Sequence, residues 1–177
     1  MSKLKLLVLP AVLSALTGVS SITAAPSAGA QPQSDARFQS LIVKDLNAVR
    51  QSRGLPPLRN NAALESAAGA HTDEMASYGY FSHNSLDGSS FATRITLYYR
   101  RGRERVSAGE NLFWASGDPT AESVVAAWAG SAPHRANLLD ANWREIGVAA
   151  IHVSAAPGVF AGGDVLIITA DFGTARS

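Results

Sequence analysis

The sequence contains no cysteine among its 177 residues, and only 16% of them are charged. The missing cysteine excludes disulfide bonds, thiol catalysis, cysteine-ligated zinc and iron–sulfur clusters. The formal net charge of +1 gives no general attraction to nucleic acid, so we expect no nucleic-acid partner. The hydrophobic share of 46% is typical of a chain that folds, and the length fits a single domain.

A long hydrophobic run is missing as well. Residues 6–19 form an uncharged, mostly apolar stretch, which is shorter than the run of about 18 residues that suggests a membrane-spanning helix. Lys3 and Lys5 precede this stretch and small residues follow it, which predicts a secretory signal peptide over residues 1–30, with Ala24 as a second possible end. We therefore expect a secreted or periplasmic protein that is soluble after cleavage, monomeric and without an integral membrane anchor.

The remaining chain predicts helices first and strands last. After a flexible tether at residues 31–36, one domain should occupy residues 37–177. Apolar spacing and capping residues predict one helix from Ser34 or Asp35 to about 53, a second from Asn60 or Asn61 to about 79, and a third over 118–130. A short helical turn should follow at 133–139. Residues 79–118 are expected to be irregular, apart from a short helix near 90–97. An alternating run at 146–150 and a second, apolar run at 165–172 predict an antiparallel strand pair, so the fold class is α+β.

Three side chains in loops or at element ends form a candidate metal site. His83 follows the second predicted helix, Glu110 lies in a Gly-Glu-Asn segment, and His134 lies at the start of a helical turn. Two imidazoles and a carboxylate are sufficient for a catalytic-type zinc with one position left for water. Spacing alone does not bring the three together, and ordinary loop histidines with a surface glutamate are the alternative. We expect Zn²⁺ or another divalent cation and no organic cofactor.

Six short motifs occur in order along the chain. They are Ala67-x-x-x-His71-x-x-x-Met75, Phe81-Ser82-His83, Gly109-Glu110-Asn111-Leu112, Trp128-x-x-Ser131-x-x-His134-Arg135-x-Asn137, Ile146-Gly147-Val148 and Thr169-x-x-Phe172. Each motif is weak alone. Their order and spacing over residues 38–173 resemble the CAP superfamily of cysteine-rich secretory proteins, antigen 5 and plant pathogenesis-related proteins, in its short, cysteine-free bacterial form.

The resemblance implies an α-β-α sandwich, with a small antiparallel sheet between helical layers and a large central cleft. It also implies that His83, Glu110 and His134 line that cleft. The family's second cleft glutamate falls at Ser131, which should still point toward the cleft but brings no charge. This departure weakens any mechanism that needs one carboxylate as general acid and another as general base.

Other side chains have a functional and a structural interpretation. His71 is either a further cleft histidine or a core histidine with a local hydrogen bond. Trp114 is either part of the cleft wall or part of the core. The arginine-rich segment from Arg94 to Arg105 either grips phosphates or headgroups, or is a solvated loop with one structural arginine.

Two functions from different classes follow. The first is a secreted CAP-domain protein whose His/Glu cleft binds a divalent metal and a small ligand, lipid or envelope component. The alternative is a zinc-dependent peptidase or esterase, in which His83 and His134 hold the metal and Glu110 is a ligand or the base.

Overall fold

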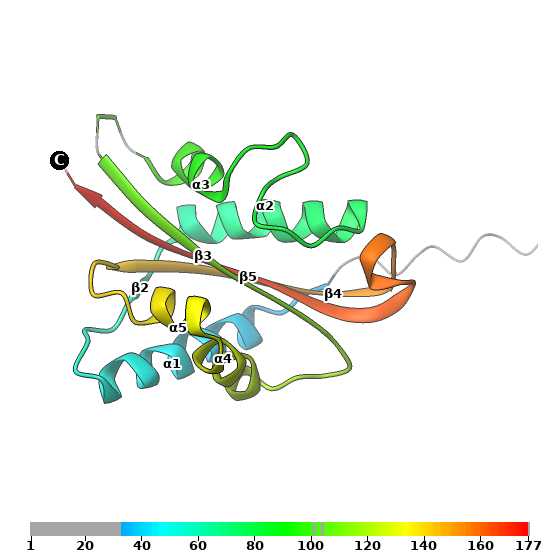
Figure 1. Ribbon diagram of the computed structural model, residues 1–177, viewed down its shortest axis with the longest axis horizontal. Coiled ribbons are helices and arrows are strands. Elements are labelled where there is room, and N and C mark those ends of the chain that lie inside the picture. The colour runs from blue at the N-terminus through cyan, green and yellow to red at the C-terminus, as the bar shows by residue number, and fades with distance from the viewer. Residues whose placement is uncertain (1–32, 101, 104, 177) are drawn as a thin grey trace, which may run out of the picture.

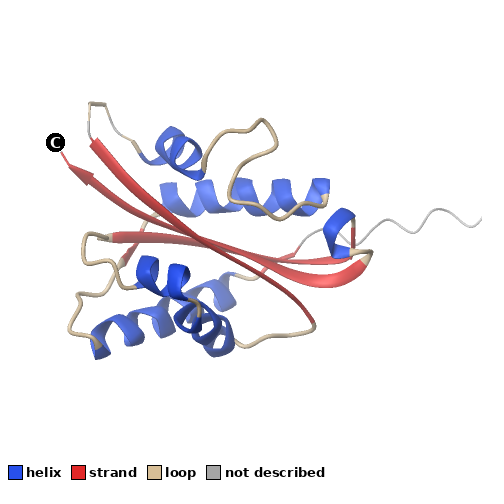
Figure 2. Ribbon diagram, in the orientation of Figure 1, coloured by secondary structure: helices blue, strands red, loops and turns tan. Residues whose placement is uncertain are grey.

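A computed structural model describes residues 33–100, 102–103 and 105–176. The predicted signal peptide and the first part of the predicted tether lie outside the described residues. Two helical layers enclose one sheet (Figure 1). Helices α2 (Ala62–Tyr78) and α3 (Phe91–Tyr99) cover one face, and α1 (Ala36–Ser52), α4 (Ala121–Gly130) and α5 (Ala132–Leu138) cover the other. Figure 2 shows the same layers coloured by secondary structure. The predicted α-β-α sandwich is therefore confirmed.

Three long strands form the body of the sheet. Strands β4 (Glu145–Ala156) and β5 (Gly163–Arg176) are antiparallel, as the two runs predict. The short 3-10 helix η1 (Gly158–Phe160) joins them. On the other side of β5 lies β3 (Arg105–Ser116), also antiparallel. Two short strands complete the sheet on β4: β1 (Gln33–Ser34) is antiparallel to it and β2 (Arg59–Asn60) is parallel.

Two expectations about these segments were wrong. Residues 79–118 are not irregular throughout, because β3 occupies the last part of them. The alternation of apolar side chains in β3 is interrupted at residues 109–111, where Gly, Glu and Asn are buried beside the cleft described below. The predicted tether also ends earlier, since residues 33–34 pair with β4 and residue 36 begins α1.

The helices begin and end at the residues that capping chemistry favours. The Asp35 side chain accepts a hydrogen bond from the Phe38 amide at 2.9 Å, and the Asn61 side chain accepts from the Ala63 amide at 2.9 Å. Gly79 ends α2 in the left-handed conformation, with φ of 68°. The next long helix starts slightly later than expected, because Thr120 and not Asp118 is its N-cap.

Most of the predicted apolar stripe of α2 is buried. Leu64, Ala68, His71 and Met75 are fully buried, whereas Tyr78 is 68% exposed. The helix lies very close to β4 at Gly147, where an added Cβ would come 2.6 Å from Glu65 Cα. On the opposite face of the sheet, Trp128 and Trp143 are buried, as expected of core tryptophans. The sandwich thus holds both helical layers in fixed positions at the edge of β3, where the candidate site lies.

Candidate functional site

A cleft of about 410 Å³ opens along β3, between the two helical layers. Its walls are His83, Asn84 and Phe91 on one side and Pro133, His134, Asn137 and Trp143 on the other, with residues 108–111 of β3 between them. The fold therefore brings His83, Glu110 and His134 to one place from three separate segments. Their roles in it differ.

Glu110 lies beneath His83 and is shielded from solvent. Its side chain is 0% exposed, while that of His83 is 48% exposed, and His83 Nδ1 is 2.7 Å from Glu110 Oε1. Because a carboxylate can only accept, we assign the proton to Nδ1, which leaves the lone pair of the neutral ring on Nε2. No described residue bonds to Nε2. The carboxylate thus fixes the orientation of the imidazole and leaves one nitrogen free.

Arg94 occupies the other side of the Glu110 carboxylate. Its Nη2 donates to Glu110 Oε2, so both carboxylate oxygens are engaged. Its Nη1 donates to Ser85 Oγ at 2.8 Å and to the His83 carbonyl at 3.4 Å. The guanidinium is buried, and it compensates the charge of Glu110 while holding the loop that carries His83. This confirms one structural arginine in the arginine-rich segment.

A second carboxyl group, Asp171, is buried behind the first. It lies opposite Glu110 in the register of β3 and β5, and its residue is 0% exposed. Neither of its oxygens has a hydrogen-bond donor among the described residues. Burial, reinforced by the negative charge of Glu110, raises the pKa of Asp171 well above its usual range. A carboxyl group whose pKa is raised therefore lies next to the ion pair of Arg94 and Glu110.

His134 is held at the opposite wall by a chain of amide contacts. The Asn111 side chain donates to the His134 carbonyl at 3.1 Å, and Asn137 donates to Asn111 Oδ1 at 3.0 Å. The Trp143 indole in turn donates to Asn137 Oδ1 at 3.1 Å. Burial, together with the nearby charge of His83, lowers the pKa of His134. Its ring is thus neutral near pH 7, which is the state that binds a metal or accepts a hydrogen bond.

Gly109 makes this arrangement possible. A Cβ at this position would come 2.8 Å from Trp143 Cζ2 and would also strike the Asn137 side chain. Without that Cβ, the helical segment that carries His134 can approach the backbone of β3.

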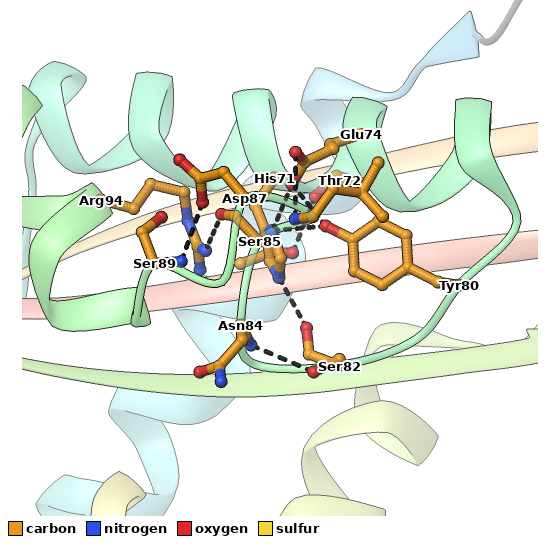
Figure 3. A network of polar contacts seen from close by, with 12 residues as sticks. His71, Thr72, Glu74, Tyr80, Ser82, Asn84, Ser85, Asp87, Ser89 and Arg94 are labelled. Carbon is orange, nitrogen blue, oxygen red and sulfur yellow. Dashed lines mark hydrogen bonds and ion pairs between the residues drawn. The ribbon is translucent and has the colours of Figure 1, made fainter.

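His71 supports the cleft from below and does not line it. Its Nε2 lies 2.8 Å from the Ser82 carbonyl, and its Nδ1 lies 3.5 Å from both the Tyr80 hydroxyl and the Glu74 carboxylate (Figure 3). The Tyr80 hydroxyl donates to that carboxylate. Glu74 also accepts a bond from the Leu86 amide at 3.4 Å. Burial lowers the pKa of His71, so the ring is neutral and donates through Nε2. This network fastens the loop after α2, on which His83 lies.

Two other tentative cleft residues also lie outside the lining. Ser131 caps the junction between α4 and α5. Trp114, on β3, is 37% exposed and packs edge-on against Phe81 and Phe160, with ring centroids 6.5 Å and 5.2 Å away. Within the described ranges, no three His, Asp or Glu side chains are arranged to hold a metal ion. Since both oxygens of Glu110 are engaged elsewhere, the cleft presents two imidazoles and not three ligands.

Sequence reasoning missed the importance of Arg94 and Asp171. Arg94 precedes Ile95 on the buried side of a short helix, a position where an arginine needs an acidic partner. Asp171 is the one acid in the apolar run 165–172, and a charge inside a buried strand was the available signal. Neither signal identifies its partner, because the pairings join distant segments.

Comparisons with known proteins agree with the fold. The family described as "CAP: Cysteine-rich secretory protein family" matches residues 43–164. The uncharacterized protein YkwD of Bacillus subtilis is 35% identical over 117 residues, which cover 66% of this chain and 44% of that protein. The chain thus spans less than half the length of this curated relative.

Two solved structures have the same fold. An extracellular protein containing an SCP domain from Bacillus anthracis has a TM-score of 0.59 at 24% identity, over 77% of this chain and 40% of that one. An outer surface protein from Borrelia burgdorferi has a TM-score of 0.63 at 18% identity, over 82% of this chain and 100% of that one.

Proposed function

The chain belongs to the cysteine-rich secretory protein (CAP) family, and on this premise we propose that it is an exported binding protein whose cleft holds a divalent cation on two imidazoles. The supporting observation is the bond between His83 Nδ1 and Glu110 Oε1 at 2.7 Å, which leaves Nε2 of His83 without a described partner in a cleft that His134 also lines. Imidazole nitrogens suit Zn²⁺, and a carboxylate behind a histidine ligand is the usual means of orienting it.

The donor set fits a cation that completes its coordination with solvent or with a bound ligand. His83 and His134 would hold the ion, while Glu110 would position His83 and raise its basicity. Such an ion supplies a positive charge to which a polar ligand group can bind. The buried Arg94 keeps Glu110 in place whether or not the ion is bound.

The cleft also suits a small amphipathic ligand. Its volume of about 410 Å³ lies within the range of 300–1,000 Å³ that is typical of small-molecule sites. Phe91 and Trp143 offer apolar surface, and Asn84 and Asn137 offer hydrogen bonds beside the two histidines. We therefore propose a lipid fragment or an envelope component with one polar end as the class of ligand.

Export is supported by the relatives and by the predicted signal peptide. The solved structures similar to this chain include an extracellular protein and a cysteine-rich secretory protein, from Bacillus anthracis and Staphylococcus aureus. Within the part of the chain that the structure describes, no helix is long and apolar enough to cross a membrane.

A zinc hydrolase is the less favoured function. A general base must reach a water in the cleft, but the Glu110 side chain is 0% exposed and both its oxygens are engaged by His83 and Arg94. Ser131, at the position of the family's second glutamate, supplies no replacement carboxylate. Binding therefore agrees better with this geometry than hydrolysis does.

The test is a Zn²⁺ titration, in which binding is measured by calorimetry and stabilisation by thermal unfolding. At about 100 times its Kd, an ion that binds only the folded protein should stabilise it by about 2.7 kcal/mol, a shift of several degrees for a chain of this size. His83→Ala and His134→Ala should abolish the shift. His152→Ala, which removes an exposed histidine of β4, is the matched control and should retain it.

Glu110→Gln separates a positioning role from a ligand role. If the carboxylate positions His83, the variant should bind Zn²⁺ about 10–100-fold more weakly and still show the shift at higher concentration. A complete loss, equal to that of His83→Ala, would make Glu110 a direct ligand. An unchanged shift in both histidine variants would refute the metal site.

A further inference from the structure

A cluster of arginines lies at the end of the sandwich where the chain leaves α3 and enters β3. Arg100 and Arg103 come from that connection, Arg105 begins β3, and Arg176 ends β5 beside it (Figure 1, near the C-terminus). All four side chains are exposed. We call these four residues the arginine end.

The positive charge of the arginine end is not balanced by any described carboxylate. Arg105 and Arg176 are directly opposite one another in the register of β3 and β5, an arrangement that is unfavourable for like charges. Among the described residues, none of the four has a carboxylate within ion-pair distance. Even with Glu104 counted, the segment 100–105 has an excess of positive charge, although the whole chain has a net charge of only +1. The positive charge is therefore concentrated locally, and an external anion would relieve the repulsion.

Apolar side chains adjoin this charge. Leu97 is 79% exposed and Tyr98 is 45% exposed, and both lie on the last turn of α3, directly before Arg100. The same helix buries Ile95 and Tyr99 in the core, so Leu97 and Tyr98 lie on its exposed side, at the end next to Arg100. An aliphatic and an aromatic side chain beside several arginines match the boundary between lipid headgroups and acyl chains.

We propose that the arginine end docks onto an anionic phospholipid surface, with Leu97 and Tyr98 in the headgroup boundary and the arginines on the phosphates. This surface is separate from the cleft and does not depend on the proposed metal site. An anionic membrane accounts for both halves of the surface. A soluble polyanion would satisfy the arginines, but it would leave the aliphatic side chain of Leu97 in water.

The experiment is co-sedimentation of the secreted protein with vesicles. One set contains only phosphatidylcholine, and a second contains about a third phosphatidylglycerol, at low and at high salt. We expect binding to the anionic vesicles at low salt, and its loss at high salt. Near the surface each arginine contributes about a fivefold factor in affinity, so R100Q/R103Q/R105Q should bind more than tenfold more weakly.

The matched control removes the same charge from the opposite helical layer. R37Q/K44Q/R53Q alters three exposed cations of α1 and its C-cap, and should bind the anionic vesicles like the unmodified protein. A second variant, L97S/Y98S, keeps the charge and should also weaken vesicle binding. Circular dichroism checks that every variant is folded.

Three results would overturn the proposal. Equal loss in both triple variants would show that net charge, and not this surface, determines binding. Full vesicle binding by L97S/Y98S would remove the apolar part of the argument. Binding to soluble polyphosphate that depends on the same arginines, without binding to vesicles, would assign the surface to a polyanion in solution.

Discussion

Glu110 and Asp171 lie directly opposite one another on β3 and β5, and both side chains are buried. Arg94 is the cation beside this pair, and of the two carboxyl groups its guanidinium donates to that of Glu110. Two buried carboxylates with one guanidinium would leave an uncompensated negative charge, which is costly in a low-dielectric interior. A proton on Asp171 removes that charge, in agreement with its raised pKa. The environment of Asp171 therefore favours the protonated form of this acid over the charged one.

The first prediction concerns Asp171→Asn. Because the folded-state pKa of Asp171 lies above its value in the unfolded chain, the unfolded chain loses this proton first as pH rises from about 4. The unmodified protein therefore loses stability from this group as pH rises toward the folded pKa, by up to about 1.4 kcal/mol per pH unit. Asparagine does not titrate, so the variant should gain stability relative to the unmodified protein as pH rises from about 4 toward the folded-state pKa of Asp171. Urea unfolding at several pH values measures the difference in unfolding free energy between the two proteins. A difference that is constant with pH would contradict the prediction.

The second prediction concerns the pair of Arg94 and Glu110. Arg94→Met leaves the Glu110 carboxylate buried without its cation, which should cost about 3–5 kcal/mol of unfolding free energy. Glu110→Gln removes the charge that needs compensation, so the double variant R94M/E110Q should be more stable than R94M alone. Denaturant unfolding of the four proteins gives the coupling energy. Strictly additive effects would mean that the two side chains do not compensate one another.

The third prediction concerns His71. Burial lowers the folded-state pKa of this imidazole below that of the unfolded chain, so its contribution to stability is complete above about pH 6.5 and is lost as pH falls toward the folded pKa. His71→Gln keeps an N–H donor for the Ser82 carbonyl but does not titrate. The stability of the variant should therefore fall less than that of the unmodified protein between pH 7 and pH 5. Parallel stability profiles of the two proteins against pH would argue against titration of His71 as the cause of the pH dependence.

Hydrogen exchange extends the test of His71 to the loop. His71→Leu removes the bond to the Ser82 carbonyl, so amides in residues 80–90 should exchange faster, while those of β4 should not. Faster exchange in both regions would indicate global destabilisation and not a loosened loop.

The fourth prediction compares two glycines. Gly147→Ala would place a methyl group against the backbone of α2 at Leu64 and Glu65, and should destabilise the protein by about 3 kcal/mol or more. Gly69 lies within α2 and an added Cβ there meets nothing within 4 Å. Gly69→Ala should therefore stabilise by roughly 0.5–1 kcal/mol through helix propensity. Thermal unfolding of both variants is sufficient, and equal effects would contradict the close approach of α2 to β4.

Local chemistry explains which parts of the fold could be predicted. Asp35, Asn61 and Gly79 mark helix boundaries through bonds to their own neighbours, and the runs 146–150 and 165–172 mark a strand pair. Strand β3 was missed because its centre, at residues 109–111, is polar and glycine-containing. Those residues are buried for contacts with Arg94, His134 and Asn137, which a local pattern does not record.

The site shows the same limit. Motif order brought His83, Glu110 and His134 together as candidates, and the structure does place all three at the cleft. Their chemistry depends on orientation: the engagement of Glu110 by Arg94 converts an expected ligand into a buried support. That engagement joins a strand to a helix on another part of the chain, so only the tertiary structure reveals it.

The two cleft histidines belong to opposite helical layers, with the edge of the sheet between them. His83 is fastened to α2 and α3 through His71 and Arg94, and His134 is fastened to β3 through Asn111. The position of each imidazole is therefore fixed by bonds to its own layer or to the sheet, and not by its loop alone. An ion or ligand that contacts both imidazoles would therefore bridge the two helical layers. Substitutions deep in either layer should consequently change which ions fit, without touching the cleft itself.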